Sequence, residues 1–186
     1  MRVIAGSAKR TVLVAPEGID TRPTSDRAKE SLFNILNEKI RGALFLDLFC
    51  GSGAIGIEAL SRGAEKVFFV DNSNKAKKAV EANLTKTKFL GKSEVIISAV
   101  SKVIGSTVIK TISSFDIIFL DPPYDTSLLE ETLPLLKNIL KKDGLIIAET
   151  DVKHEPYITD DFCIKYVKIY GRNKFIFLTH EETLWH

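Results

Sequence analysis

The strongest constraint on the fold is an alternation between short apolar runs and stretches with helical periodicity. The strand-like runs lie at residues 44–48, 67–70, 95–97, 117–120 and 145–148. The helix-like stretches between them surround residues 55–62, 74–88, 100–112 and 128–140. Nearly continuous apolar strands that alternate with helices are typical of a buried parallel sheet with helices on both faces. The pattern therefore predicts an α/β fold with a doubly wound, mostly parallel, Rossmann-like sheet.

The two ends of the chain depart from this alternation. β-like segments at 2–4 and 11–14 predict a small N-terminal hairpin, and apolar residues at helical spacing then predict a helix up to Ile40. Ser25 or Asp26 is available as its N-cap and Gly42 as its terminator. Near the C-terminus, segments 165–170 and 174–179 have no helix between them, which predicts a closing antiparallel hairpin and a seven-stranded sheet. We predict residues 1–41 as an N-terminal extension and residues 42–186 as the main domain.

Size and residue content exclude several classes of protein. A chain of 186 residues with 45% hydrophobic and 27% charged residues can bury the core of one globular domain. No apolar run approaches the roughly 18 residues that cross a bilayer, and no signal-peptide core is present, so we expect a cytoplasmic protein. Cys50 and Cys163 lack the spacing of a zinc site, and we expect two free thiols and no metal.

Charge is spread unevenly along the chain. The net charge is only +2, but residues 1–41 carry eight Lys and Arg against five acidic residues. The remaining residues carry 18 basic against 19 acidic side chains. A basic front end on a nearly neutral body favours a polyanionic partner such as nucleic acid.

A glycine-rich loop follows the first predicted strand. Gly51, Gly53 and Gly56 lie between this strand and a helix, where glycines allow a close ligand approach and the helix N-terminus offers free N–H groups. Asp71, at the end of the next predicted strand, could bind a ribose of either NAD or S-adenosylmethionine (AdoMet). Asp47 favours AdoMet, because a carboxylate attracts a sulfonium and an ammonium but repels a pyrophosphate. The alternatives are that Asp47 orients N–H groups of the loop and that Asp71 caps the next helix.

The tetrapeptide Asp121-Pro122-Pro123-Tyr124 directly follows the predicted strand at 117–120. Two prolines fix the backbone and remove two donors, so the segment presents carbonyl oxygens and a carboxylate as acceptors. Such acceptors would hold an NH₂ group with its lone pair turned toward a methyl donor, and Tyr124 would stack on the base that carries the amine. The alternative is an ordinary proline-rich loop with a helix-capping Asp121. The pattern favours an amino methyltransferase.

Several segments together resemble one family over nearly the whole chain. They are residues 1–6, residues 21–34, Asp47-x-Phe49-x-Gly51-Ser52-Gly53 with its continuation to Ala64, and the tetrapeptide at 121–124. The chain resembles the RsmD family of bacterial 16S ribosomal RNA guanine-N2 methyltransferases. The resemblance implies an AdoMet-dependent methyltransferase domain and transfer of a methyl group to the exocyclic N2 of a guanine in 16S ribosomal RNA.

The resemblance also implies roles for individual residues. The cofactor-binding set would be Asp47, Phe49, Gly51, Gly53, Asp71, Asn72, Ser98 and Ala99. Family members often carry an acidic or amide residue near position 99, whereas here only Ser98 or backbone groups could bind the adenine amine. The N-terminal part would engage RNA through Lys9, Arg10, Arg22 and Arg27.

Other functions stay open at this point. The same tetrapeptide would suit a DNA adenine-N6 or protein-glutamine methyltransferase, and the glycine loop alone would suit an NAD-binding oxidoreductase. We expect 16S ribosomal RNA within a small-subunit particle as the partner, with no membrane and no obligate protein partner. Because the chain is small and weakly charged, we expect naked RNA to be held poorly.

Overall fold

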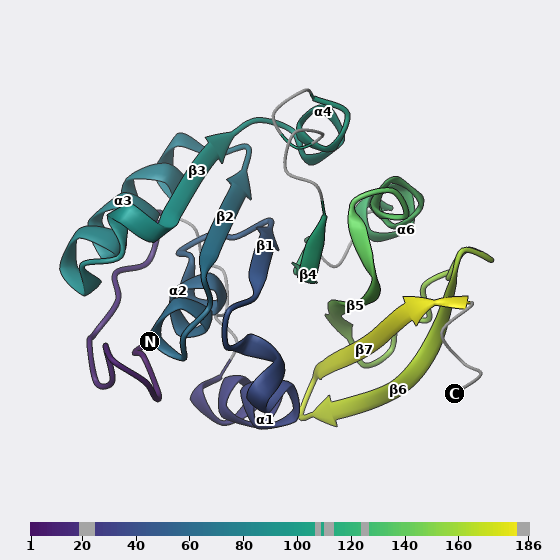
Figure 1. Cartoon of the computed structure of the whole chain (residues 1–186), viewed down its shortest axis with the longest axis horizontal. Helices are drawn as coiled ribbons and strands as arrows, with labels where there is room; N and C mark the ends of the chain where they lie inside the picture. The colour runs from purple at the N-terminus through teal and green to yellow at the C-terminus, as the bar shows by residue number, and fades with distance from the viewer. Residues whose placement is uncertain (19–24, 107–108, 110–113, 124–126, 182–186) are drawn as a thin grey trace.

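The computed structural model describes residues 1–18, 25–106, 109, 114–123 and 127–181. A seven-stranded sheet with the order β3-β2-β1-β4-β5-β7-β6 forms its centre (Figure 1). The strands are β1 (Leu44–Leu48), β2 (Lys66–Asp71), β3 (Ser93–Ile97), β4 (Phe115–Leu120), β5 (Leu140–Asp151), β6 (Phe162–Tyr170) and β7 (Asn173–His180). Strands β1 to β5 pair in parallel, and β7 is antiparallel to both β5 and β6. The predicted α/β fold class and its closing hairpin are confirmed.

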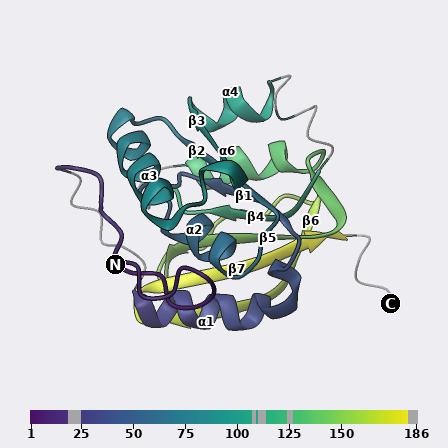
Figure 2. The ribbon, with the colours of Figure 1, turned by 60° about the vertical axis from the view of Figure 1, so that its left-hand side comes forward.

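Helices cover both faces of the sheet because the central strands are apolar on both sides. The helices are α1 (Asp26–Leu36), α2 (Ala54–Ser61), α3 (Asn74–Thr87), α4 (Val100–Ile104) and α6 (Leu128–Thr132), with 3₁₀ segments η1 (Asn37–Ile40), η2 (Leu90–Lys92) and η3 (Leu133–Leu136). Residues of α1, α2 and α3 share one hydrophobic cluster, and residues of α4, α6 and η3 share a second. Figure 2 shows α1 beneath the sheet, and in Figure 1 the helix lies next to the end of the hairpin where β6 joins β7. Among the described residues, no helix combines the length and apolar character needed to cross a membrane.

Helix α1 begins as the sequence predicts and ends earlier. Of the two candidate N-caps, Ser25 has the capping role, since its side chain accepts a hydrogen bond from the Ala28 N–H. The predicted terminator Gly42 is wrong, because the helix ends at Leu36 and Asn37 forms the cap with a φ of 35°. The chain then continues to Ile40 as a tighter 3₁₀ turn.

Two other predicted bounds need correction on the far side of the sheet. The helix expected at 128–140 is α-helical only to Thr132 and then becomes a 3₁₀ turn that contains Pro134. Proline removes an intrahelical donor and favours such a break. Strand β5, expected at 145–148, runs over 12 residues, because residues 140–144 extend it at its start and residues 149–151 extend it at its end.

The N-terminal hairpin is shorter than the expected segments. One antiparallel bridge joins Arg2 and Val12, and the backbone N–H of Val3 donates to the Thr11 carbonyl at 2.9 Å. Most of the remaining polar backbone of residues 4–8 binds helix α2 instead of a β partner. Ser7 N–H, for example, donates to the Ser61 carbonyl at 2.8 Å.

Glu58 of α2 is the central contact between the N-terminal segment and the main sheet. One carboxylate oxygen accepts from the Ile4 N–H at 2.7 Å and lies 3.5 Å from Lys29 Nζ. The other accepts from the Ala5 N–H at 3.0 Å and from Arg62 Nε at 2.8 Å. Glu58 and Lys29 are 0% and 1% exposed, so this charged pair is fully removed from water. Burial lowers the pKa of Lys29, and the nearby Glu58 and Asp26 carboxylates oppose that shift in part.

Candidate active site

The predicted cofactor loop and the predicted catalytic segment meet at the carboxyl edge of the sheet. Strand β1 lies between β2 and β4, so the chain reverses its direction of sheet growth at the β1–β4 boundary. Ligands of open α/β sheets bind at such a switch point. Asp121 lies directly beside β1, with its backbone N–H 3.4 Å from the Leu48 carbonyl, and Cys50 N–H donates to the Val70 carbonyl of β2 at 3.1 Å.

The glycine loop ends at the N-cap of α2. Gly53 is the N-cap with a left-handed φ of 73°, a conformation that glycine adopts without steric cost. A Cβ atom on Gly56 would lie 2.4 Å from the Phe69 ring, so glycine allows α2 to approach strand β2 closely. Asp47 is 2% exposed and accepts from the Gly56 N–H at 2.9 Å. Asp47 therefore orients the first turn of α2, which is the alternative that the sequence left open beside a cofactor contact.

Asp71 closes the loop from the neighbouring strand. Its two carboxylate oxygens accept from the Gly51 N–H and the Ser73 N–H, each at 2.9 Å. An ionised carboxylate has about four acceptor positions, so two hydrogen bonds leave capacity for hydroxyl groups of a ligand. Its backbone carbonyl accepts from Ser98 N–H at 2.9 Å, which brings the end of β3 to the same edge.

The other predicted cofactor residues surround this edge with different exposures. Phe49 is half-buried with a left-handed φ of 58° and packs against the second hydrophobic cluster. Asn72 and Ala99 are exposed, and Ala99 is the N-cap of α4. Ser98 is half-buried. Their contact with a cofactor stays a prediction.

The tetrapeptide predicted to be catalytic, residues 121–124, is described only in part. Asp121 is half-buried, Pro122 is buried and Pro123 is exposed. Tyr124 lies outside the described residues, and its predicted stacking role stays a prediction. The two prolines continue directly from β4, so Asp121 is held by the end of a strand that is paired on both sides.

Glu149 is a candidate site residue that the sequence did not predict. Leu120 pairs with Ala148 in the parallel β4–β5 register, which places Asp121 and Glu149 at equivalent positions on adjacent strands. Glu149 is 1% exposed, and a carboxylate oxygen accepts from the Asn173 side-chain amide. The sequence does contain a pattern that indicates this position, because Asp121 and Glu149 are each the first residue after an apolar run.

The carboxylates at this edge share an acidic, poorly hydrated environment. Burial raises the pKa of Asp47 to about 8, with the Asp71 carboxylate adding to the shift and the Gly56 N–H opposing it. The pKa of Asp121 is raised well above its usual range by burial and by the Glu149 and Asp47 carboxylates. Burial and mutual repulsion therefore disfavour the charged forms of these carboxyls, and a cationic ligand would favour their ionisation.

We expect this burial to give the ligand-free protein a distinctive pH dependence. Between the unfolded pKa of Asp47 near 3.9 and its folded pKa of about 8, the folded state binds more protons, so its stability is present at low pH and is lost as pH rises. Urea unfolding of the parent and of Asp47→Asn at several pH values should reveal this loss of stability. The parent should lose about 1.4 kcal/mol more than the variant for each unit between pH 5 and 7. Curves of unfolding free energy against pH that run parallel for the two proteins would contradict the raised pKa of Asp47.

The described RNA-binding candidates gather on the N-terminal extension. A surface hollow between the N-terminal segment and α1 is lined by Arg2, Val3, Ile4, Lys9, Arg10, Asp26, Arg27 and Glu30. Lys9, Arg10 and Arg27 are exposed there, while Arg2 forms an ion pair with Asp26 at 3.0 Å. Arg22 lies outside the described residues. The structure thus brings three of the four predicted cations to one hollow.

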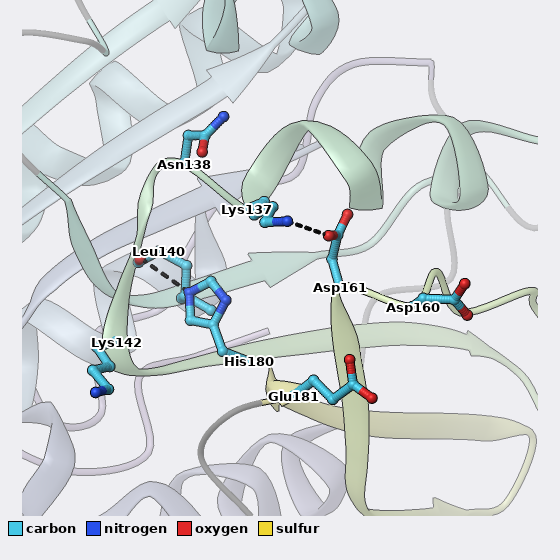
Figure 3. Close-up of a pocket in the computed structure, with 8 residues that line it drawn as sticks. All are labelled: Lys137, Asn138, Leu140, Lys142, Asp160, Asp161, His180 and Glu181. Carbon is cyan, nitrogen blue, oxygen red and sulfur yellow. Dashed lines mark hydrogen bonds and ion pairs between the residues drawn. The ribbon is translucent and has the colours of Figure 1, made fainter.

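A second hollow lies away from these residues, where β5 begins and β7 ends (Figure 3). Some of its polar side chains have partners within it. Lys137 forms an ion pair with Asp161 at 2.6 Å, and a ring nitrogen of His180 lies 3.2 Å from the Leu140 carbonyl oxygen. None of the residues predicted for catalysis or cofactor binding lines it. Cys50 and Cys163 are both free thiols, and the described part of the chain holds no cluster of three or more metal-ligating side chains.

Comparison with known proteins places this architecture in a class. The ribosomal protein L11 methylase of Lactobacillus delbrueckii subsp. bulgaricus has the same fold, with a TM-score of 0.74 at 18% identity over 94% of this chain and 88% of that chain. A solved structure of the Escherichia coli protein yhhF has a TM-score of 0.82 at 31% identity and covers 97% of this chain and 98% of that chain. The fold, with a glycine loop at its switch point, is that of the Rossmann-like methyltransferases.

Sequence comparison then identifies the family. A family model described as "Conserved hypothetical protein 95" matches residues 1–179. The Ribosomal RNA small subunit methyltransferase D of Haemophilus influenzae is 37% identical over 165 residues, which cover 87% of this chain and 83% of that protein. The chain belongs to this family, and the resemblance to the RsmD family is confirmed.

Proposed function

We propose that this chain transfers a methyl group from AdoMet to the exocyclic N2 amine of a guanine in 16S ribosomal RNA. The observation that carries the proposal is the position of Asp121 and Pro122 beside the glycine loop, at the switch point of a methyltransferase fold. The name of the Haemophilus influenzae relative supports small-subunit ribosomal RNA as the substrate class. The choice of guanine N2 rests on the resemblance carried by residues 21–34.

The residues at the carboxyl edge fit AdoMet better than NAD. AdoMet carries a sulfonium and an ammonium, which would favour the ionised forms of the buried Asp47 and Asp121 carboxyls, whereas a pyrophosphate would oppose their ionisation. A Cβ atom on Gly51 would meet no atom within 4 Å, so a ligand has space to approach this part of the loop. Asp71 would hold the ribose hydroxyls with its remaining acceptor positions. When bound, AdoMet supplies an electrophilic methyl group.

Asp121 and Pro122 would act on the acceptor base. A base amine is a weak nucleophile because its lone pair is delocalised into the ring. If Asp121 Oδ and the Pro122 carbonyl each accept one amine hydrogen, the nitrogen is held in place with its lone pair free for in-line transfer. When the nitrogen gains the methyl group that AdoMet would supply, it must lose one amine proton, and the Asp121 carboxylate would accept that proton. Asp121 and Glu149 occupy equivalent positions on adjacent strands, so their two carboxyls together would provide the acceptor for this proton.

An assembled or partly assembled small-subunit particle in the cytoplasm is the partner we propose. The whole chain has a net charge of only +2, which gives weak attraction for naked RNA. A particle would supply part of the recognition surface, and the hollow lined by Lys9, Arg10 and Arg27 would contact its phosphates.

Incubation with methyl-labelled AdoMet and undermethylated small-subunit particles tests the proposal. Digestion to nucleosides should place the label in N2-methylguanine. Label in N6-methyladenine would indicate another amino methyltransferase with the same site, and label in protein would indicate a glutamine acceptor. Either result, or the absence of transfer to any acceptor, would overturn the assignment.

Asp71→Ala is expected to weaken AdoMet binding by about 1.5–3 kcal/mol, roughly 10- to 150-fold, because the ribose hydroxyls and the Gly51 N–H lose their acceptor. Isothermal titration calorimetry measures the change. Ser73→Ala is the matched control, since Ser73 caps α3 without being expected to contact the cofactor. That variant should lose about 1 kcal/mol of stability and retain AdoMet affinity. Unchanged affinity in Asp71→Ala would reduce Asp71 to a structural role.

Alanine at Lys9, Arg10, Arg22 or Arg27 is expected to weaken particle binding and leave AdoMet binding unchanged. Each lost phosphate contact should also reduce the slope of log affinity against log salt by about 0.7–0.9. Filter binding over a salt series gives both quantities. Lys39→Ala is the control, because Lys39 is exposed on the same extension but does not line the hollow. Salt-independent affinity of the parent would contradict the proposed surface.

A further inference from the structure

Asn83 of α3 links two segments that the proposed function assigns to different ligands. The side chain is fully buried, with 0% exposure. Its Oδ1 accepts from the Val14 N–H at 2.8 Å, and its Nδ2 donates to the Val14 carbonyl at 2.9 Å. The same Nδ2 donates to the Ser52 carbonyl at 3.0 Å. One amide thus uses both of its donors and its acceptor on two separate stretches of backbone.

Each partner of Asn83 belongs to a functional segment. Ser52 lies between Gly51 and Gly53 in the cofactor loop. Val14 lies in the N-terminal segment, four residues after Arg10, and its side chain is 47% exposed. Val14 is therefore held through its backbone and not through its side chain. A second contact joins the same two segments, since Ser52 Oγ lies 3.3 Å from Met1 Sδ.

Amide chemistry makes this link specific to asparagine. The two backbone carbonyls need a donor and the Val14 N–H needs an acceptor, and a primary amide supplies both from one planar group. Aspartate has nearly the same shape but would direct an oxygen at two carbonyl oxygens. Aliphatic residues would leave three partly buried backbone groups without this partner, at a cost for each.

We propose that Asn83 is a positioning residue that couples the RNA-engaging N-terminal segment to the cofactor loop, so that RNA and AdoMet each strengthen the binding of the other. The inference rests on the proposed function of the two segments. A segment that is ordered by RNA holds Val14, Val14 holds the Asn83 amide, and the amide holds Ser52. Coupling between two binding equilibria is reciprocal, so loop ordering by AdoMet must favour RNA engagement equally.

Asn83→Asp tests the link in the full-length protein. AdoMet affinity is measured by titration with and without undermethylated small-subunit particles. In the parent, particles should raise AdoMet affinity about fivefold or more, and in Asn83→Asp this ratio should fall to about one. The KM for AdoMet should rise in the variant while kcat at saturating AdoMet stays within about twofold. A parent that binds no AdoMet overturns the proposed function. A parent that binds AdoMet equally well with and without particles overturns the coupling alone.

Amide hydrogen exchange provides a readout that needs no ligand. Exchange at the Gly51 and Gly53 amides should quicken about fivefold or more in Asn83→Asp. Lys86→Met is the matched control, because Lys86 Nζ also binds the N-terminal segment, donating to the Val12 carbonyl at 2.6 Å and not to the loop. Lys86→Met should quicken amide exchange in the N-terminal segment only and leave the Gly51 and Gly53 amides unchanged. If Asn83→Asp fails to fold, Val14→Pro, which removes the N–H donor to Asn83 and also fixes the backbone at residue 14, should give the same loss of coupling. An unchanged loop in whichever variant folds would overturn the inference.

Discussion

Asp121→Ala is expected to lower the kcat of methyl transfer by about 100-fold or more while AdoMet affinity changes by less than about threefold. The carboxylate is proposed to hold the acceptor amine and take its proton, so its loss removes interactions that are strongest in the transition state. Single-turnover transfer from labelled AdoMet measures the rate, and calorimetric titration measures the affinity. The fold should persist, because the change removes one of several carboxylates that repel one another at this edge.

Asp143→Ala is the control for this variant, since Asp143 is exposed in β5 and outside the site. It should retain parental turnover and stability. A rate within threefold of the parent for Asp121→Ala would remove the proposed mechanism. Loss of AdoMet binding together with turnover would assign Asp121 to the cofactor instead of the base.

Glu58→Ala is expected to lower the free energy of unfolding by about 3–5 kcal/mol. Glu58 is 0% exposed and accepts hydrogen bonds from two backbone N–H groups and from Arg62. Its removal would leave the Lys29 ammonium buried without its carboxylate partner, which is far more costly than losing a surface ion pair. Urea denaturation monitored by circular dichroism measures the change.

Two further variants separate the buried charge from the loss of packing. Glu94→Ala breaks the Lys66–Glu94 pair, in which each side chain is 40% exposed, and should cost no more than about 1 kcal/mol. The double variant Lys29→Met, Glu58→Leu removes both buried charges and should recover part of the lost stability. Equal losses in Glu58→Ala and Glu94→Ala would contradict the account of the N-terminal attachment.

The order of strands and helices could be predicted because it depends on local pattern. Apolar runs such as residues 44–48 and 117–120 are buried on both faces, so their composition shows directly in the sequence. The bounds of α6 and β5 depend on tertiary pairing and on Pro134, and local periodicity overestimated the helix and underestimated the strand. The attachment of residues 4–8 to Glu58 and Ser61 could not be predicted, because it joins backbone groups to side chains more than 50 positions away.

Candidate site residues differ in how much the sequence reveals about them. Gly53 and Gly56 belong to a recognisable strand–loop–helix motif, so their place was predictable. The sequence left two roles open for Asp47, and only the geometry shows its bond to the Gly56 N–H. Glu149 joins Asp121 only through the β4–β5 register, which no local pattern specifies. The same holds for Asn83, whose partners come from two distant segments.

Nucleoside mass spectrometry of small-subunit ribosomal RNA, from cells with and without this protein, tests the central claim most directly. We predict that N2-methylguanine disappears from one position in cells that lack the protein and returns when the parental gene, but not Asp121→Ala, is supplied. An unchanged content of N2-methylguanine, or loss of N6-methyladenine in its place, would contradict the claim.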